Sequence, residues 1–450
     1  MDAFNENLNE QQAQQPMGCL HRFSKTIKVV IIGLLILLLM IPMFMIENLI
    51  SERGRTQEEA IDEVSEKWSL AQTITGPYLN LQYPVVTENN GEKKVSIKDL
   101  ILFPDELMVN GQLKTEILKR SIYEVNVYQS ELTLKGSFSS EELKKSRIDM
   151  DQLQFDRAAI CLNLTDMRGI SEQISITLGD SVYIFEPGMD NRGIANTGVH
   201  AIANLSELKQ NKKLPYEIKI KLKGSQSLNF IPLGKTTRVD LKANWNTPSF
   251  TGNYLPNNRN ITEKEFSAQW QVLNLNRNYS QVMVDYNTSN IKDIENSSFG
   301  VNFKIPVEQY QQSMRSAKYA ILIILLTFGV IFFTEIMNKT RIHALQYLLV
   351  GLALCLFYSL LLSFSEHIGF NPAYLLSSAL TIILVGGYMF GITKKKKPSL
   401  IMSGLLGILY LYIFVLIQLE TFALLAGSLG LLIILAMVMY FSKKIDWFNE

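Results

Sequence analysis

The chain has 450 residues, of which 47% are hydrophobic, and its 43 Lys and Arg nearly balance its 42 Asp and Glu. The formal net charge of +1 gives no overall attraction to nucleic acid, and the length allows two or three domains. The three cysteines (Cys19, Cys161 and Cys355) lie far apart and offer no internal disulfide, so packing must hold the fold together.

The first predicted element is an apolar, charge-free segment at residues 29–46. About 20 apolar residues in a helix span a bilayer core of about 30 Å. The segment is longer than the apolar region of a cleavable signal peptide, and no A-x-A-like site follows it. We therefore predict residues 1–26 as a cytoplasmic Gln-rich tail and residues 27–46 as an uncleaved signal anchor, the first transmembrane helix.

Residues 47–316 are predicted as one exported domain that begins with a helix. Ala60, Val64 and Trp68 recur at four-residue spacing with charged residues between them. This spacing places one residue above another on a single helix face. We expect the helix to cover residues 47–72 and to continue the first span out of the membrane.

Further along the domain, the pattern changes from helical spacing to alternation. In YEIKIKLKG, which begins at Tyr216, and in RVDLKANW, which begins at Arg238, apolar residues alternate with polar or charged ones. A period of two gives a strand one packed face and one solvated face, as in an antiparallel sandwich. The segment at residues 141–153 is expected to be a helical or loop excursion. The sequence therefore predicts a β-rich, sandwich-like domain.

Few sequence motifs in this domain are typical of catalysis or ligand binding, and we identify no catalytic, metal-binding or cofactor-binding residues in it. Asp166 and Arg168 suit a structural ion pair within a loop. The segment WNTPSFTGNYLP contains Trp245, Phe250 and Tyr254 and is rich in Gly and Pro. It fits either a rigid aromatic contact loop or a packed corner of the domain, and the packed corner is the more ordinary interpretation.

Residues 317–442 are predicted as a five-span transmembrane bundle, and residues 443–450 as a second cytoplasmic tail. With the first helix, the bundle gives six spans, since each apolar segment approaches the length that a bilayer requires. The five segments are residues 319–334, 344–365, 368–393, 398–419 and 421–442. The shortest reaches the interfaces through the long side chains of Lys318 and Glu335.

Lys and Arg in the short flanking segments set the orientation of the spans. Eleven of them fall on one side, and the turns around Glu366 and Glu420 on the other side hold none. The eleven are Arg22, Lys25, Lys28, Lys339, Arg341, Lys394, Lys395, Lys396, Lys397, Lys443 and Lys444. We therefore predict that both termini are cytoplasmic and that residues 47–316 are periplasmic.

Three ionisable residues form a candidate polar cluster at the predicted outer interface: Glu366, His367 and Glu420. They could cap the spans and hydrogen-bond the exported domain, contact a partner or a lipid headgroup, or bind a metal for acid–base chemistry. His343 cannot join them, because the 23 residues from His343 to Glu366 cover about 35 Å of helix. No H-E-x-x-H occurs, and the chain has only four His, which weakens the metal hypothesis. The structural interpretation is favoured.

At the other end of the second span, Glu335 and Arg341 form a candidate ion pair at the predicted inner interface. A carboxylate buried in lipid would point to function, but this one can reach the interface and a nearby cation. No ionisable residue falls in the middle of a span. A carrier built on these spans would therefore be limited to apolar cargo.

Several long segments closely resemble the CreD family of inner membrane proteins, which are associated with cell envelope integrity. They include HALQYLLVGLALCLFYSLLLSFSEHIGFNPAYL from His343, RSAKYAILIILLTFGVIFFTE from Arg315, and WNTPSFTGNYLP. The resemblance covers about Ser24 to Phe448. It departs at Thr421 and Phe422, where the family pattern has an acidic residue and a Tyr. It implies a Gram-negative inner membrane location and tolerance of envelope-targeting agents, and it supplies no reaction and no catalytic residues.

From the sequence we expect a non-enzymatic inner membrane protein that supports envelope integrity by binding an envelope protein or lipid through its periplasmic domain. The expected partners are the lipid bilayer and an envelope protein or lipid. We expect no binding of nucleic acid and no cofactor. One alternative is a transporter or flippase-like carrier of apolar cargo. A second is an outer-leaflet metalloenzyme centred on Glu366, His367 and Glu420.

Overall fold

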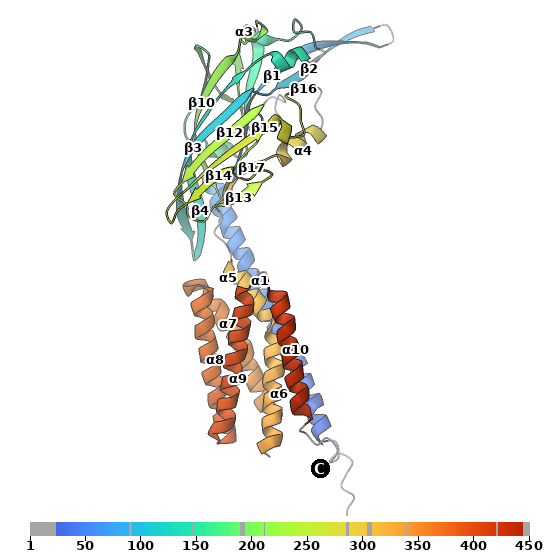
Figure 1. The fold of residues 1–450 in the computed structure, drawn as a ribbon, viewed down its shortest axis with the longest axis vertical. Helices are drawn as coiled ribbons and strands as arrows, with labels where there is room; N and C mark the ends of the chain where they lie inside the picture. The colour runs from blue at the N-terminus through green and yellow to red at the C-terminus, as the bar shows by residue number, and fades with distance from the viewer. Residues whose placement is uncertain are drawn as a thin grey trace, which may run out of the picture. The chain divides into compact units, whose positions relative to one another are not determined.

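The structure is a computed structural model that describes residues 24–89, 92–145, 148–189, 194–210, 212–284, 288–303, 308–338, 340–419 and 422–443. The chain divides into two compact units. Residues 57–306 make a β-rich unit, and the residues before and after them make a helical unit (Figure 1).

The first sheet of the β-rich unit has nine strands among the described residues. They are β1 (Gln72–Asn89), β2 (Glu92–Leu102), β5 (Ala158–Leu164), β8 (Glu186–Pro187), β9 (Val199–Ala203), β11 (Ser227–Phe230), β13 (Ser249–Gly252), β16 (Val282–Val284) and β17 (Phe299–Asn302). Their order is β13-β17-β11-β1-β5-β9-β8, with β2 paired to β1 and β16 paired to β2. Strand β1 therefore occupies a central position and pairs with three neighbours.

The second sheet has eight strands within the described part of the chain. They are β3 (Glu106–Arg120), β4 (Tyr123–Phe138), β6 (Ser175–Leu178), β7 (Ser181–Ile184), β10 (Leu214–Ser225), β12 (Thr236–Ala243), β14 (Asn258–Ile261) and β15 (Phe266–Leu273). Their order is β14-β15-β12-β3-β4-β10-β6-β7.

The two sheets enclose one apolar core to which both contribute side chains. In β10, Ile218 and Ile220 are buried and Lys219 between them is exposed, as the alternation in the sequence predicts. The β-rich character and the alternation of faces are thus confirmed. Most strand pairs are antiparallel, but β1 pairs parallel with β11 and β3 pairs parallel with β12. The sequence missed these pairs because alternation reports which face is packed and not the direction of the neighbouring strand.

Short helices and turns connect the strands. The α-helices are α2 (Glu141–Lys145), α3 (Ser206–Lys209) and α4 (Thr288–Asn296), and the 3₁₀ helices are η1 (Phe155–Arg157), η2 (Met167–Gly169) and η3 (Asn274–Asn276). Helix α2 lies within the predicted excursion at residues 141–153. Helix α4 and the loop around Ile194 cover part of the outer face of the first sheet, where a second, smaller apolar cluster forms.

Over its described residues, the helical unit is built from the N-terminal helix and six helices near the C-terminus. They are α1 (Ser24–Trp68), α5 (Glu308–Lys318), α6 (Ala320–Asn338), α7 (Ala344–Ile368), α8 (Phe370–Thr393), α9 (Lys396–Gln418) and α10 (Ala423–Ser442). Helix α1 runs on into the β-rich unit and ends at Trp68, four residues before the predicted end at 72.

Five of the helices are long and apolar enough to cross a membrane, counted over the described residues: α1, α6, α7, α8 and α9. The sixth predicted span corresponds to α10, whose described apolar run covers Leu425–Met437. Five candidate spans are therefore established by length and composition. The sixth rests on the 20-residue length of α10.

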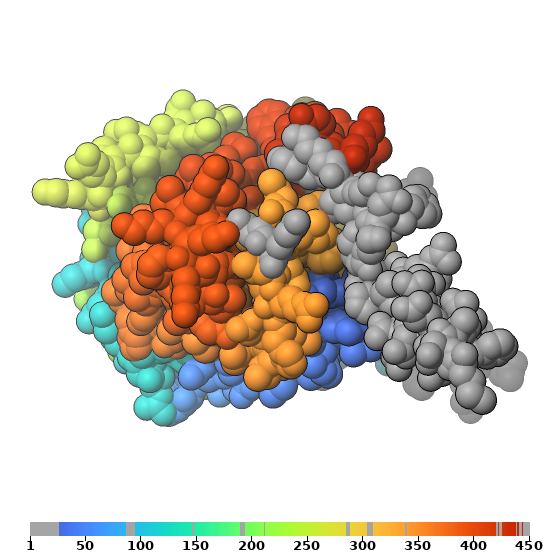
Figure 2. All heavy atoms as spheres, turned by 90° about the horizontal axis from the view of Figure 1, so that it is seen from below, coloured from blue at the N-terminus to red at the C-terminus, as the bar shows by residue number. Residues whose placement is uncertain are grey.

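Helix α1 contributes one narrow stripe of side chains to the helical unit. Leu35, Leu39 and Met43, four residues apart, are buried, whereas Leu37 is 71% exposed. Spacing of four puts the buried residues on one side of the helix, and the other apolar side chains are left for lipid. In the view along the bundle, α1 (blue) lies at its edge beside α6 (orange) (Figure 2).

Candidate functional site

Glu366 joins three helices at one end of the helical unit. Its side chain is 9% exposed, and its Oε1 accepts a hydrogen bond from the Tyr310 hydroxyl of α5 at 3.0 Å. The Arg53 Nε of α1 lies 3.7 Å from the same oxygen. This carboxylate therefore ties α1 and α5 to the last turn of α7. We call this group of three residues the Glu366 clamp.

His367 does not share the surroundings of its neighbour. It is exposed, because adjacent residues on a helix point about 100° apart. Helix α7 ends at Ile368, and Gly369 links it to α8 with φ +77° and ψ 166°, a backbone conformation that suits only glycine. Glu420, the third member of the predicted cluster, lies outside the described residues.

Glu335 joins three helices at the other end of α7. Its carboxylate pairs with the Lys28 ammonium of α1 and accepts hydrogen bonds from the Tyr347 hydroxyl of α7 at 3.2 Å and the Ile342 N–H at 3.2 Å. The Lys28 ammonium also donates to the Ile342 carbonyl at 3.1 Å. We call Lys28, Glu335 and Tyr347 the Glu335 clamp.

The cation in this clamp differs from the predicted one. The sequence pointed to Arg341 because it lies six residues from Glu335, but Arg341 is exposed and Lys28 occupies the site. Lys28 is 307 residues away along the chain. Only the packing of α1 against α6 and α7 brings it there, and local spacing carries no signal of that packing.

The aromatic residues of the predicted contact loop all pack against the sandwich core. The Trp245 ring meets Phe303 with centroids 6.5 Å apart, and Phe250 meets Trp270 at 5.7 Å. The Tyr254 hydroxyl donates to a backbone carbonyl at 2.8 Å. These contacts are those of a packed corner. The use of this loop as a contact surface stays a prediction.

Asp166 anchors the end of α1 within the β-rich unit. It is buried and accepts hydrogen bonds from the Leu70 N–H at 2.9 Å and the Arg168 Nε at 2.9 Å. The Arg168 Nη1 donates to the Glu66 carbonyl in the last turn of α1 at 2.6 Å. Burial by itself would raise the pKa of Asp166, but the hydrogen bonds from Arg168 and Leu70 outweigh it and lower this pKa below its ordinary value. The predicted Asp166–Arg168 ion pair is present.

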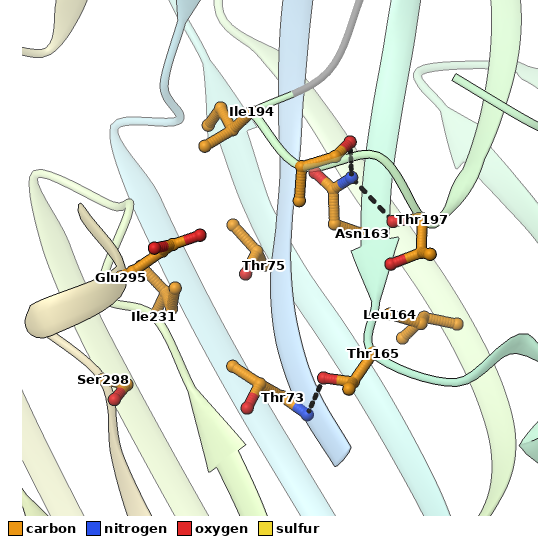
Figure 3. A pocket seen from close by; sticks show the side chains of 11 residues that line it. Thr73, Thr75, Asn163, Leu164, Thr165, Ile194, Thr197, Ile231, Glu295 and Ser298 are labelled. Atoms are coloured by element: carbon orange, nitrogen blue, oxygen red, sulfur yellow. Dashed lines mark hydrogen bonds between the residues drawn. The ribbon is translucent and has the colours of Figure 1, made fainter. Parts of the chain in front are cut away.

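A pocket on the outer face of the first sheet brings together polar residues that the sequence did not single out (Figure 3). Its volume is about 260 Å³. One side of the pocket is formed by strands β1 and β5. Strand β1 contributes Thr73 and Thr75, and β5 contributes Asn163, with Thr165 just after the strand. The remaining lining residues come from the loop at 194–197, from Ile231 and from the end of α4: Ile194, Ala195, Thr197, Ile231, Glu295 and Ser298, together with Leu164.

Asn163 holds one wall of this pocket in place. Its Nδ2 donates to the carbonyls of Ala195 at 3.0 Å and Thr197 at 2.8 Å, and its Oδ1 accepts from the Tyr78 hydroxyl at 2.6 Å. The Thr165 hydroxyl accepts from the Thr73 N–H at 3.0 Å. Figure 3 shows the two bonds that Asn163 donates and the bond between Thr73 and Thr165. The wall is therefore fixed by bonds within the protein.

A local signal for the pocket exists in the sequence, although it is weak. In QTITG, Thr73 and Thr75 occupy alternate positions of a strand, and in LNLT, Asn163 and Thr165 do the same. Hydroxyl and amide side chains on one face of two strands are compatible with a solvated surface as well as with a pocket. The loop and helix that enclose them come from distant parts of the chain, so the pocket could not be predicted.

No group of three or more His, Cys, Asp or Glu side chains is placed to hold a metal ion within the described part of the chain. Glu366 and His367 lack their third predicted partner there, since Glu420 falls outside that part. The geometry thus gives no support to the metalloenzyme hypothesis.

Comparison with known proteins gives a match over nearly the whole chain. A family model described as "Inner membrane protein CreD" matches residues 24–448. The inner membrane protein CreD of Escherichia coli strain K12 is 32% identical over 420 residues, which cover 92% of this chain and 91% of the relative.

Proposed function

The chain belongs to the CreD family of inner membrane proteins, and from this premise we propose that it supports the integrity of the cell envelope by binding an envelope component through its β-rich unit. In this proposal the protein is anchored by its apolar helices and catalyses no reaction. The β-rich unit faces the periplasm and both termini are cytoplasmic, since the Lys and Arg residues of the short flanking segments gather on one side of the spans.

The pocket on the first sheet is the observation that carries the proposal. It combines fixed walls, an opening to solvent and polar groups that are free to bind a ligand. The hydroxyls of Thr73, Thr75, Thr197 and Ser298 and the carboxylate of Glu295 form no hydrogen bond with the residues that the structure describes. Pockets with a few convergent polar groups are the usual form of small-molecule sites.

Two substitutions test the role of the pocket. Thr75→Val keeps the shape of a buried side chain and removes its hydroxyl, and Glu295→Gln removes the charge from the rim. Each variant is expressed in a strain that lacks the protein, and survival under an envelope-targeting agent is scored at matched membrane levels. We expect both variants to lose most of the rescue.

The matched controls remove the same groups elsewhere in the β-rich unit. Thr177→Val and Glu186→Gln alter exposed residues of β6 and β8, outside the pocket. They are expected to rescue like the wild type. Full rescue by both pocket variants at normal protein levels would reject the proposed role of the pocket.

A second candidate function, the carrier of apolar cargo, is favoured by a groove in the helical unit. A cavity of about 350 Å³ lies among α6, α9 and α10, and its lining is almost entirely apolar, with Gly329, Tyr412 and Gly430 among the lining residues. Such a groove suits an acyl chain. Because lipid fills grooves of this kind in any bilayer, the groove supports cargo movement less strongly than the polar pocket supports binding.

The carrier hypothesis is tested in liposomes that contain a fluorescent phospholipid. Transbilayer movement is followed by quenching the outer leaflet with dithionite. Gly329→Leu adds bulk at a position that lines the groove, where no described atom lies within 4 Å of an added Cβ. Gly387→Leu adds the same bulk at a similarly open position outside the groove. A carrier would move lipid in the wild type and in Gly387→Leu but not in Gly329→Leu. Equal lipid movement by the wild type and both variants, or no lipid movement by any of them, would exclude the carrier hypothesis.

A further inference from the structure

The side chains of β1 and β5 on the outer face of the first sheet change from apolar to polar where the pocket begins. Tyr78 and Cys161 are cross-strand neighbours on β1 and β5 and belong to the small apolar cluster on the outer face. The next pair along the same strands is Thr75 and Asn163. The outer face is thus covered by apolar side chains up to Tyr78 and by hydroxyl and amide groups beyond it.

Several side chains that line the cavity carry hydrogen-bonding groups that form no hydrogen bond with the described residues. Thr75 is 6% exposed, and its hydroxyl forms no hydrogen bond with any residue the structure describes. The hydroxyl borders an open cavity and is not one of the fully buried groups that lack a partner, so water reaches it, and a ligand hydroxyl can replace that water and form the same hydrogen bond. Thr73, Thr197 and Ser298 add further hydroxyls around the same space (Figure 3).

The charge of the lining selects the class of ligand. Among the lining residues that the structure describes, Glu295 is the one that is ionisable, and none of them is Lys, Arg or His. Among these described residues, an anion such as a phosphate would meet a carboxylate and no cation, which is unfavourable. A ligand that carries hydroxyls and a positive group would satisfy both the hydroxyl lining and Glu295.

The volume of the pocket and the apolar part of its lining restrict the class of ligand further. The volume of about 260 Å³ is slightly below the range of roughly 300 to 1,000 Å³ that holds drug-sized ligands. Ile194 and Ile231 form an apolar part of the lining. A single sugar ring combines a compact shape, many hydroxyls and an apolar C–H surface.

We infer that this pocket binds one sugar ring and prefers a sugar that carries an amino group, with Glu295 receiving the ammonium and the threonine and serine hydroxyls bonding to the ring hydroxyls. The inference rests on the proposed binding function and names the ligand class of the same site. The ring can come from a free amino sugar or from one unit of a glycan, since both present the same groups.

The experiment measures ligand binding by the full chain, purified in detergent, with isothermal titration calorimetry. The probes are glucosamine, glucose, glucose 6-phosphate and a chitosan tetramer. We expect glucosamine to bind about ten times more tightly than glucose, since a charge-assisted hydrogen bond contributes about one factor of ten. Glucose 6-phosphate is expected not to bind. Tighter binding of the tetramer than of glucosamine would identify a glycan as the source, and equal binding a free sugar.

Two variants assign the binding to this pocket. Glu295→Gln is expected to abolish the preference for glucosamine while it retains glucose binding, and Thr75→Val to weaken both sugars. Glu186→Gln and Thr177→Val should leave both affinities unchanged. Absence of binding by any of the sugars, or identical affinities in Glu295→Gln and the wild type, would overturn the inference.

The sugar-binding experiment and the rescue experiment test different claims, so one can fail without the other. If the pocket variants fail to rescue the strain but no sugar binds, the pocket is functional and its ligand is not a sugar. If glucosamine binds in a Glu295-dependent manner and the pocket variants still rescue, the ligand class is correct and the proposed role in envelope integrity is wrong.

Discussion

Glu335 and Glu366 in the helical unit are held by the same kinds of partner. Each accepts a hydrogen bond from a tyrosine hydroxyl, and each pairs with a cation from α1. A carboxylate at the end of an apolar helix is costly unless its charge is balanced and its oxygens are bonded. At both positions the structure supplies a cation and a donor, which explains how otherwise apolar helices tolerate these residues.

Removal of the carboxylate from the Glu335 clamp should destabilise the protein. Glu335→Ala removes the acceptor of the Tyr347 hydroxyl and leaves the Lys28 ammonium with the Ile342 carbonyl but without its counter-ion, and the cost of breaking a buried pair is about 3 kcal/mol. We expect a lower temperature of thermal unfolding in detergent. The double variant Lys28→Met/Glu335→Leu should recover most of the loss, because no uncompensated charge is left.

The control for this clamp is Arg341→Ala, which removes an exposed cation near Glu335 and should leave the unfolding temperature unchanged. The clamp would have no stabilising role if Glu335→Ala unfolded at the temperature of the wild type. If Arg341→Ala lowered the unfolding temperature more than Lys28→Ala, the cation paired with Glu335 would be Arg341, as the sequence predicted.

Glu366 and His367 are adjacent in sequence but should respond differently to substitution. Glu366→Ala releases Arg53 and Tyr310 from α7, so we expect a lower unfolding temperature and a lower level in the membrane. The loss should be smaller than for Glu335→Ala, since Arg53 is 47% exposed and its pair is the longer one at 3.7 Å. His367→Ala should change neither quantity. Equal effects of the two variants would contradict the assignment of Glu366 alone to the clamp.

Asp166 should make the β-rich unit sensitive to acid. Its carboxyl group has a lower pKa in the folded chain than in the unfolded chain, where it is about 3.9. Folding is therefore favoured by the ionised group above that pH, and this contribution is lost as the pH falls through the lower folded-state pKa. Asp166→Asn should be less stable than the wild type at pH 7.

The measurement is thermal unfolding of the full chain at several pH values from about 7 down to about 2, followed by circular dichroism of the β signal. The difference between the wild type and Asp166→Asn should shrink in acid. Asp180→Asn, in an exposed turn, controls for the loss of one negative charge. A difference that stays constant down to the lowest pH would show that ionisation of Asp166 does not stabilise the fold.

At the scale of helices and strands, the features that could be predicted from the sequence are those that depend on a local pattern of residues. Apolar segments of sufficient length gave α1 and α6 to α9, and alternation gave the buried face of β10. Pairings between distant segments were not predictable, because no local pattern encodes them. The parallel pair β1–β11, the contact of Lys28 with Glu335 and the Thr-lined pocket all belong to this second class.

The turn between α7 and α8 depends on one glycine. Gly369 has φ +77° and ψ 166°, a region that costs other residues about 1 to 3 kcal/mol. Gly369→Ala should therefore lower the unfolding temperature, although open space surrounds the position. Gly387→Ala, within α8 and also in open space, should be neutral or slightly stabilising. Equal unfolding temperatures for both variants would show that the turn does not need glycine.

At the scale of the whole chain, the two clamps lie far enough apart on α1 for a membrane-spanning segment to fit between them. Lys28 and Arg53 are 25 residues apart on this helix, which corresponds to about 37 Å along its axis. A hydrocarbon core of about 30 Å fits between them, with each cation at an interface. The clamps also occupy opposite ends of α7, so the same two clamps delimit comparable lengths of α1 and α7.

This arrangement predicts which residues are accessible from each side of the membrane. Arg341 and His367 are exposed and flank opposite ends of α7. In a background of Cys19→Ser, Cys161→Ala and Cys355→Ala, either position is replaced by cysteine, as Arg341→Cys or His367→Cys, and treated with a membrane-impermeant maleimide in spheroplasts.

Because the Lys and Arg residues of the short flanking segments gather at the Arg341 end, we expect that end to be cytoplasmic. His367→Cys should then be labelled in intact spheroplasts, and Arg341→Cys only after the membrane is permeabilised. The reverse pattern would place the β-rich unit in the cytoplasm, since α1 carries the chain into that unit from the end where Arg53 meets Glu366. It would then exclude a periplasmic ligand for the pocket, whatever sugars the purified protein binds.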